Sequence, residues 1–430
     1  MIETNKKVAF YTLGCKLNFS ETSTIARKFE KKGFTKVDFN SVADIYVINT
    51  CSVTEHTDKK CRQAIKKAIK NAPNAFIVVV GCYSQLKARD IASIPGVDLI
   101  LGTNEKFNLF DYIKNFDKKE TPQIFSCDIE KVNQFFSSFS LGERTRSFLK
   151  IQDGCDYSCS YCTIPLARGK SRNNHIKEIV KEAERIAQNG IKEIVITGVN
   201  IGDFGKSTNE TFYDLINELD KVEGIERYRI SSIEPNLLSG KIIEFVAQSN
   251  KFVPHFHMPL QSGNNKILQL MNRKYKKELF KNLITRIKSI IPEACIGIDV
   301  ITGFPGETNE DFMETYNFIN SLDVSYLHVF SYSERKNTKA VELKEKVSPR
   351  GKNERSKTLH KLSDDKRRNF YLQNLKKNTL VLFEANKKNG EMFGFTENYI
   401  RVETKYDQTL IGKIVEVKLK KIGKNGNVII

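Results

Sequence analysis

Long hydrophobic runs are absent from this 430-residue sequence. No uninterrupted stretch of about 18 apolar residues occurs, so an ordinary membrane-spanning helix is not expected. The amino terminus, MIETNKKVAFYTLG, also lacks the long apolar core of a secretory signal peptide. We therefore expect a cytoplasmic protein without a membrane partner. Hydrophobic residues still make up 40% of the chain, which is enough to build sizeable buried cores and excludes a disordered protein.

Acidic residues are the scarcer of the two charges. The chain holds 69 Lys and Arg against 51 Asp and Glu, a formal net charge of +18. More than half of this excess lies in residues 350–430, where 19 basic residues face nine acidic ones. A basic tail of this kind predicts a polyanionic partner, nucleic acid before any other.

Strands and helices alternate through residues 1–118, which we expect to form the first domain. The predicted strands are VAFYTLG (8–14), DIYVINT (44–50) and AFIVVVG (75–81). Asn18 and Glu21 stand at capping-box spacing at the start of the helix that follows the first strand. Such alternation predicts a parallel, doubly wound α/β sheet.

A second α/β domain is expected over residues 141–370, after an aperiodic linker at 119–140. Its six predicted strands lie at 148–152, 193–198, 227–233, 254–260, 295–303 and 326–332. Six β/α units around one axis form a partial (β/α)6 barrel, with chemistry at the carboxyl ends of the strands. The final residues, 373–430, alternate short strands and turn signals, which predicts a small all-β barrel of the nucleic-acid-binding kind.

Nine cysteines in a reducing compartment indicate metal or redox chemistry rather than disulfides. Cys155, Cys159 and Cys162 are spaced C-x3-C-x2-C within GCDYSCSYC. A structural zinc ion requires a fourth protein ligand, and the nearest candidate, His175, opens a predicted helix. A cubane iron–sulfur cluster has four irons, so three cysteines leave one iron open to a substrate.

A second set of cysteines, Cys15, Cys51 and Cys82, directly follows the three predicted strands of the first domain. In a parallel sheet the carboxyl ends of the strands share one edge, where ligands bind. We therefore expect a second three-cysteine cluster. The other thiols, Cys61, Cys127 and Cys295, have no such partners and are interpreted as structural or incidental.

The C-x3-C-x2-C loop, with Tyr161 before its last cysteine, resembles the signature of the radical S-adenosylmethionine (SAM) superfamily. Together with the second cysteine set and the basic tail, the chain resembles the methylthiotransferases over roughly residues 6–118, 141–370 and 373–430. The motifs YTLGCKLN, NTCSVTEHTDKKCRQ and FLKIQDGCDYSCSYCTIPLARGKSR look most like the subfamily acting on N6-threonylcarbamoyladenosine (t6A) in tRNA. The isopentenyladenosine subfamily typically has Gln-Met in place of Lys16-Leu17.

One segment departs from the family pattern. In SYSERKNTKA (331–340), Lys336 and Asn337 replace the usual Pro-Gly. Asparagine tolerates a left-handed backbone better than most residues, so we expect the turn to survive.

The resemblance implies an auxiliary 4Fe–4S cluster in the first domain, a radical SAM barrel and a C-terminal TRAM domain that binds RNA. One SAM would methylate sulfur at the auxiliary cluster. A second SAM, cleaved at the Cys155, Cys159 and Cys162 cluster, would yield a radical that abstracts hydrogen from C2 of t6A at position 37, giving the 2-methylthio product. The implied partners are the tRNA anticodon stem-loop and a low-potential electron donor such as flavodoxin or ferredoxin.

Residues at the ends of the barrel strands are candidates for binding SAM, although each could equally form a turn or a satisfied buried polar group: Gly198, Asn200, Ser232, Glu234, His257, Gln261 and Asp299. Candidates for binding RNA are Arg168, Lys170, Arg172, Tyr399 and Arg401. The aromatic residues of the tail could instead fill a small core.

Four alternatives remain open at this point. The substrate could be isopentenyladenosine in tRNA, or an aspartate of a ribosomal protein, although the +10 tail argues against the latter. The chain could be a radical SAM enzyme that inserts no sulfur, or a non-catalytic RNA-binding protein with structural zinc.

We predict about eight irons with matching sulfide per chain after anaerobic reconstitution, because two cubane clusters hold four irons each. Elemental analysis of the purified protein measures this directly. Zinc without iron would contradict the enzyme interpretation, and about four irons would contradict the second cluster.

Overall fold

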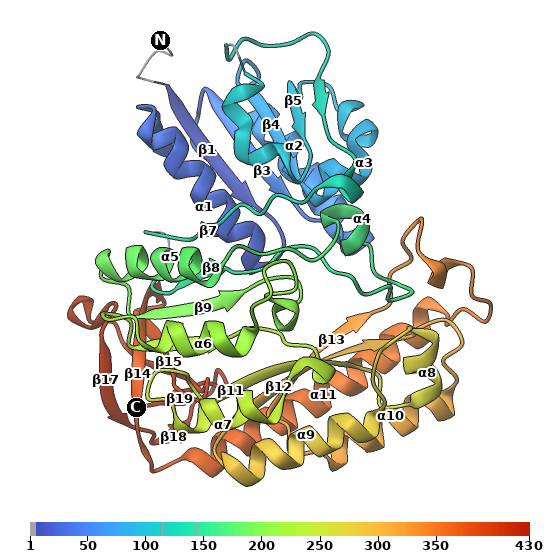
Figure 1. Ribbon diagram of the computed structural model, residues 1–430, viewed down its shortest axis with the longest axis vertical. Helices are drawn as coiled ribbons and strands as arrows, with labels where there is room; N and C mark the ends of the chain where they lie inside the picture. Colours follow the sequence, from blue (N-terminus) through green and yellow to red (C-terminus); the bar gives the residue numbers. More distant parts are fainter. Residues whose placement is uncertain (1–5, 114, 143) are drawn as a thin grey trace.

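A computed structural model describes residues 6–113, 115–142 and 144–430 of the protein. Three parts follow one another along the chain: an α/β sheet domain, an open α/β barrel and a C-terminal all-β sheet (Figure 1). The predicted α/β fold class is confirmed.

The N-terminal domain is built on a six-stranded sheet in which all strand pairs are parallel. Its order is β2-β1-β3-β4-β5-β6. The strands are β1 (Lys7–Thr12), β2 (Thr35–Val37), β3 (Ile45–Thr50), β4 (Phe76–Gly81), β5 (Leu99–Leu101) and β6 (Gln123–Phe125). The order 2-1-3-4-5 places a topological switch point between β1 and β3.

Helices cover both faces of this sheet, as predicted for a doubly wound domain. Helix α1 (Lys16–Lys31) packs on the face that includes Val8, whereas α2 (Glu55–Asn71) and α3 (Cys82–Ala92) pack on the face that includes Ala9. Strands β3 and β4 are buried on both sides, which explains their uninterrupted apolar sequences.

Three details of this domain differ from the sequence interpretation. Strands β2, β5 and β6 were not predicted, because three-residue strands are too short to show a period. Strand β6 lies within the expected linker, so this segment extends the sheet. The residue that caps α1 is Cys15, without a side-chain hydrogen bond, and not Asn18.

The central domain contains the six predicted parallel strands. They are β8 (Ser147–Lys150), β9 (Glu193–Thr197), β10 (Arg227–Ile230), β11 (His255–Gln261), β12 (Cys295–Thr302) and β13 (Tyr326–Ser331). They form two sheets, β10-β9-β8-β7 and β11-β12-β13, where β7 (Ser138–Phe139) is an unpredicted antiparallel edge strand. Parallel bridges from Tyr228 to Phe252 and from Ser232 to His257 join the sheets into an open barrel.

Helices surround this barrel, and six of the described ones pack with its strands into one large apolar core: α5 (Ile176–Gln188), α6 (Phe212–Asp220), α7 (Gly240–Gln248), α9 (Lys277–Ile290), α10 (Asn309–Ser321) and α11 (Pro349–Asn374). Two shorter helices, α4 (Ile164–Arg168) and α8 (Asn265–Leu270), lie outside this core. Among the described residues, no helix is both long and apolar enough to cross a bilayer.

The C-terminal sheet has the order β17-β14-β15-β16-β19-β18. Its strands are β14 (Asn378–Lys388), β15 (Glu391–Thr396), β16 (Arg401–Lys405), β17 (Ile414–Lys418), β18 (Lys421–Ile422) and β19 (Val428–Ile429). It docks on the barrel through two buried arginines of β10. Arg227 donates a hydrogen bond to the carbonyl of Leu380 (2.9 Å), and Arg229 to that of Glu397 (3.0 Å).

Candidate active site

The first cysteine set lies in the loop that follows β8, at the carboxyl end of the barrel. Gly154, at φ +71°, precedes Cys155, and a β-carbon there would meet the carbonyl oxygen of Lys170 at 1.9 Å. Only glycine therefore fits where the loop returns against itself. Burial raises the pKa of the Cys155 thiol to about 11 and that of Cys162 to about 12. Binding a cation that releases these protons would offset the cost of burial.

The second set follows the neighbouring strands β1, β3 and β4, so the predicted shared edge is confirmed. Cys51 and Cys82 are buried, whereas Cys15 is exposed. Burial raises the pKa of Cys51, and the nearby thiols of Cys82 and Cys15 raise it further. Gly14, at φ +105°, lies so close that a β-carbon would meet the Cys51 side chain at 2.6 Å. The three thiols thus share one electrostatic environment.

The spacing of the sulfur atoms tests which metal group fits. Zinc with 2.3 Å bonds to sulfur in a tetrahedron requires ligand atoms about 3.8 Å apart. Within the described residues, the group of three donor atoms close enough together to hold one metal ion is His257, Asp299 and His328, and neither cysteine set forms such a group. Three thiols without a fourth protein ligand suit a larger cluster with one open iron.

A buried group of five charges joins the two domains beside these loops, and we call it the interface charge cluster. Its members are Glu21 of α1, Lys106, Lys150 of β8, Asp153 and Arg168 of α4, and each is at least 97% buried. Arg168 donates to Glu21 (3.0 and 3.1 Å) and to Asp153 (2.9 Å). Lys106 and Lys150 donate to Glu21 at 2.6 and 3.0 Å.

The two carboxylates of this cluster remain ionised despite their burial. Burial acts to raise the pKa of Glu21, but Arg168, Lys106 and Lys150 outweigh it and hold the pKa well below its usual range. The pKa of Asp153 is lowered in the same way. Three cations against two carboxylates make a satisfied, nearly neutral group, the condition under which buried charges persist.

Arg168 also contacts the loop of the other cysteine set. Its Nη2 donates to Oδ1 of Asn18 at 2.6 Å, and the Asn18 amide donates to the carbonyls of Leu13 (2.8 Å) and Thr50 (3.0 Å). These carbonyls lie within two residues of Cys15 and Cys51. One arginine therefore positions both cysteine loops.

A second link crosses the interface from the loop after β13. Arg335 donates to the hydroxyl of Ser52 (2.6 Å) and to the carboxylate of Asp58 (2.9 Å), directly behind Cys51. Asn337 adopts φ +66°, so the left-handed turn expected at the family departure is confirmed.

A cavity of about 280 Å³ lies between the domains, with a predominantly apolar lining. Val53 and Thr54 line it from the N-terminal domain, and Cys162 and Asp299 are among the residues that line it from the barrel. A cysteine of the first set thus faces a chamber whose other wall begins two residues after Cys51.

Several SAM candidates are engaged with residues that the sequence did not single out. The amides of Val199 and Asn200 donate to Oε1 of Gln152 at 3.0 and 2.8 Å, which leaves carbonyls for an ammonium group. Glu234 pairs with Arg273, and Arg273 also donates to the sulfur of Cys159 at 3.2 Å.

The other rim candidates are brought together. His257 contacts Asp299 (2.8 Å), with His328 on the same carboxylate oxygen at 3.3 Å. Ser232 bridges to His257 through the backbone, and Gln261, at φ +65°, lines the cavity with an unpaired buried oxygen.

The RNA candidates near the cysteines require correction. Arg168 belongs to the interface charge cluster, and Arg172 is buried against the carbonyls of Gln134 (2.9 Å) and Lys170 (3.1 Å). Neither side chain can reach a phosphate, because each is buried and forms its hydrogen bonds with groups inside the protein. Of the three, only Lys170 is exposed.

The tail candidates lie where the C-terminal sheet meets the barrel. Tyr399 stacks on Phe395, with ring centroids 4.8 Å apart, and lies 4.4 Å from the His255 ring. Arg401 is exposed, with its guanidinium 4.4 Å from the centroid of the buried Phe393 ring.

Sequence reasoning missed Glu21, Asp153, Gln152 and Arg273. Glu21 lies among other polar residues of α1, so the sequence pattern around it indicated a solvent-exposed position or a helix cap. Among the missed residues, Gln152 and Asp153 had a local signal, since they lie between a predicted strand and the cysteine loop.

Comparison with known proteins agrees with this geometry. Residues 149–319 match the model of the radical SAM superfamily, and residues 7–102 match that of the "Uncharacterized protein family UPF0004". A radical SAM methyltransferase, TsrM from Kitasatospora setae, superposes with a TM-score of 0.55 over 76% of this chain and 75% of that chain, at 14% identity. At this low identity, the similarity supports a shared fold only.

Relatives with higher identity span almost the whole chain. "Threonylcarbamoyladenosine tRNA methylthiotransferase MtaB" of Bacillus subtilis is 41% identical over 97% of this chain and 94% of its own. The protein of that name from Thermotoga maritima is 33% identical over 98% and 96%. "tRNA-2-methylthio-N(6)-dimethylallyladenosine synthase" of Clostridium tetani is 32% identical over 97% and 95%.

An open barrel with a three-cysteine loop at its carboxyl end defines a radical SAM protein, here with a second three-cysteine domain attached. Over nearly its full length, the chain belongs to the family of radical SAM tRNA methylthiotransferases.

We predict that Glu21→Gln lowers the free energy of unfolding by about 3–5 kcal/mol, because three buried cations would then face one carboxylate. Urea unfolding followed by circular dichroism measures this. Glu30→Gln, an exposed position on the same helix, is the matched control and should change stability by less than about 0.5 kcal/mol.

The pH dependence has a definite sign. Because the folded pKa of Glu21 lies below its unfolded value of about 4.3, the stabilisation is fully present above that value and is lost as the pH falls. The difference between wild type and Glu21→Gln should therefore narrow below about pH 4. If the difference in the free energy of unfolding stayed constant down to pH 2, Glu21 would not be an ionised member of the interface charge cluster.

Proposed function

We propose that this protein transfers a methylthio group to C2 of N6-threonylcarbamoyladenosine at position 37 of tRNA. The observation that carries the proposal is the pairing of two three-cysteine loops across one domain interface, where Arg168 bonds Asp153 beside one loop and, through Asn18 of α1, is linked to the carbonyls of the other. A single cluster would serve radical formation alone, whereas sulfur insertion needs a second site near the first.

Cys155, Cys159 and Cys162 hold the 4Fe–4S cluster of a radical SAM protein, and we propose that Cys15, Cys51 and Cys82 hold a second one. When bound, these clusters and SAM would supply the electron, the radical, the sulfur and the methyl group.

The chain's own residues orient and shield this chemistry. Burial raises the pKa of the Cys159 thiol, and the buried cation of Arg273 against its sulfur opposes that rise, in the direction of the thiolate form that binds iron. Gln152 ties the Cys155 loop to the loop after β9, because its amide bonds both. The apolar cavity limits access of water, which would otherwise compete for reactive intermediates.

The charge near Cys15 favours t6A over the dimethylallyl substrate, since the threonyl substituent carries a carboxylate and the dimethylallyl group carries no charge. Lys16 makes no hydrogen bond or ion pair to the described residues. The surrounding protein lowers the pKa of its ammonium, and Arg146 and Arg229 lower it further, whereas Asp299 acts to raise it. A carboxylate placed here would relieve the excess positive potential.

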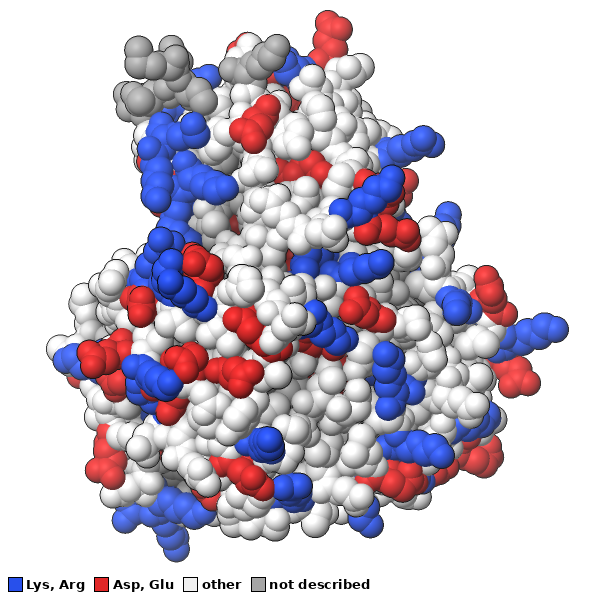
Figure 2. Space-filling view, in the orientation of Figure 1, with Lys and Arg blue, Asp and Glu red and all other residues white. Residues whose placement is uncertain are grey.

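The tRNA would be held by the basic surfaces of the protein. Figure 2 shows Lys and Arg gathered along the edge of the N-terminal domain where α1 lies, and the last turn of α1 carries Lys28 and Lys31. Exposed Arg401 and the Phe395–Tyr399 stack of the C-terminal sheet offer the combination that binds bases and phosphates. The anticodon stem-loop as the contacted region, and a flavodoxin or ferredoxin as electron donor, are parts of this proposal.

Mass spectrometry of tRNA nucleosides from cells lacking the protein tests the substrate. We expect the 2-methylthio derivative of t6A to disappear and t6A to remain. Persistence of that derivative, with no second enzyme present, would overturn the assignment. In vitro, replacing Cys15, Cys51 and Cys82 together by alanine should abolish methylthiolation while SAM cleavage continues.

We expect Lys16→Gln to lower kcat/KM for t6A-containing tRNA by about 10- to 100-fold, because a hydrogen bond between charged groups contributes about 1.5–3 kcal/mol. Lys16→Arg should retain most of the activity, and Lys66→Gln, an exposed position on α2 outside the surfaces proposed to bind tRNA, is the control. An unchanged kcat/KM in Lys16→Gln would rule out recognition of the carboxylate by this residue.

A further inference from the structure

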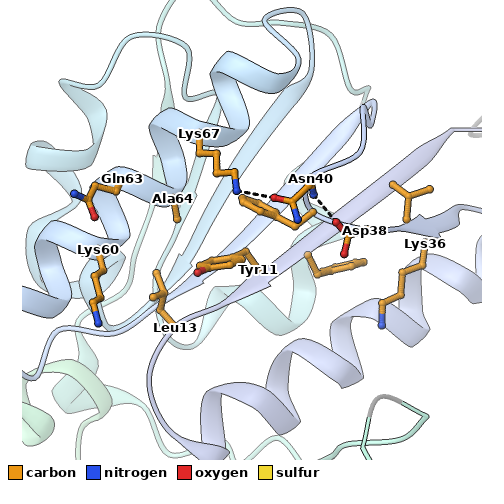
Figure 3. A pocket seen from close by; sticks show the side chains of 12 residues that line it. Tyr11, Leu13, Lys36, Asp38, Asn40, Lys60, Gln63, Ala64 and Lys67 are labelled. Carbon is orange, nitrogen blue, oxygen red and sulfur yellow. Dashed lines mark hydrogen bonds between the residues drawn. The ribbon is translucent and has the colours of Figure 1, made fainter. Parts of the chain in front are cut away.

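The largest hollow of the N-terminal domain lies away from the inter-domain cavity. It is a groove of about 1100 Å³ bounded by α2, the segment 36–40 after β2, and the end of β1. Figure 3 shows Tyr11 in its centre, with Lys60 of α2 on one side and Lys36 on the other.

The topology of the sheet explains why this groove is open. Strands β2 and β3 are parallel and lie on either side of β1, and such a crossover normally contains a dozen or more residues and a helix. Here it contains only residues 38–44 and no helix. The face of β1 that carries Tyr11 therefore lacks the helix that would otherwise cover it.

An aromatic platform takes the place of that helix. The Tyr11 ring packs on Phe39 with centroids 4.5 Å apart, yet Tyr11 remains 38% exposed. A large ring supported by a second aromatic side chain is thus accessible to solvent, and a nucleobase can stack on such a ring.

The polar lining of the groove is basic. Leaving Lys36 aside, Lys60 and Lys67 line the groove together with one carboxylate, Asp38. Lys67 donates to the Asn40 side chain at 2.6 Å rather than to an acid, and Lys60 pairs with no carboxylate among the described residues. The groove therefore has a net positive charge that suits a phosphate backbone.

The groove also leads to the cysteine edge. Strand β1, whose end lines the groove, stops at Thr12, and the chain continues through Leu13 to Cys15, at most about 13 Å from Tyr11. A polymer bound in the groove is thereby directed toward the proposed reaction site.

We propose that this groove binds a single-stranded segment of the substrate tRNA, with one base stacked on Tyr11 and an adjacent phosphate contacted by Lys60. This inference rests on the proposed function, because it takes tRNA as the substrate. It adds a binding surface on the N-terminal domain, distinct from the C-terminal sheet.

Fluorescence anisotropy with the reconstituted protein and labelled t6A-containing tRNA tests the proposal. Tyr11→Leu, which keeps an apolar floor but removes the ring face, should weaken binding about tenfold, whereas Tyr11→Phe should bind like wild type. Lys60→Glu should also weaken binding about tenfold and reduce the slope of log affinity against log salt by about 0.7. Lys66→Glu, the same charge change on the same helix outside the groove, is the matched control.

Iron content and the thermal unfolding midpoint show that each variant is folded. If wild type binds tRNA and both Tyr11→Leu and Lys60→Glu bind equally well, the groove proposal is overturned while the proposed function stands. The groove proposal is also overturned if these variants bind tRNA normally but their clusters are reduced more slowly by an acidic electron-donor protein. That result would assign the groove to the electron donor. A wild-type protein that binds no tRNA would overturn the proposed function and the groove together.

Discussion

The arrangement of this site depends on the interface charge cluster. Arg168, directly after the cysteine loop of the barrel, is neutralised by Glu21 of the N-terminal domain and Asp153 of the barrel. The cost of burying these charges is repaid only when all partners are in place, so the cluster specifies one relative position of the two domains. A hydrophobic interface of equal area would tolerate sliding, whereas this one fixes which loop faces which.

Close backbone packing supports the same geometry. Gly14 and Gly154 each precede a cysteine, and each adopts a positive φ where a β-carbon would collide with the opposing segment. Both cysteine loops therefore pack closer to the opposing segment than a residue with a β-carbon would allow. The interface charge cluster determines the relative position of the two domains, and the glycines allow the close packing of the cysteine loops. Together they define the apolar cavity between the domains.

The sequence predicted features that depend on neighbouring residues better than features that depend on residues far apart in the chain. The barrel strands were predicted because each is four to eight residues long and rich in apolar or β-branched residues, and β2, β5 and β6 were missed because three residues carry no period. The RNA assignment of Arg168 was wrong because the sequence around a basic residue does not show whether its partner is a phosphate or a buried carboxylate. Its partner Glu21 lies 147 residues away.

By itself, the sequence determined the fold class, the two cysteine sets and the resemblance to methylthiotransferases. These features are encoded locally: three thiols within eight residues, and cysteines placed directly after apolar strands. Only the tertiary structure decided which charges are buried, that Arg335 supports the Cys51 loop, and that a missing crossover helix leaves Tyr11 exposed. Pairings over such separations depend on how the domains dock, because local periodicity reports the burial of a residue but not the partner that it meets.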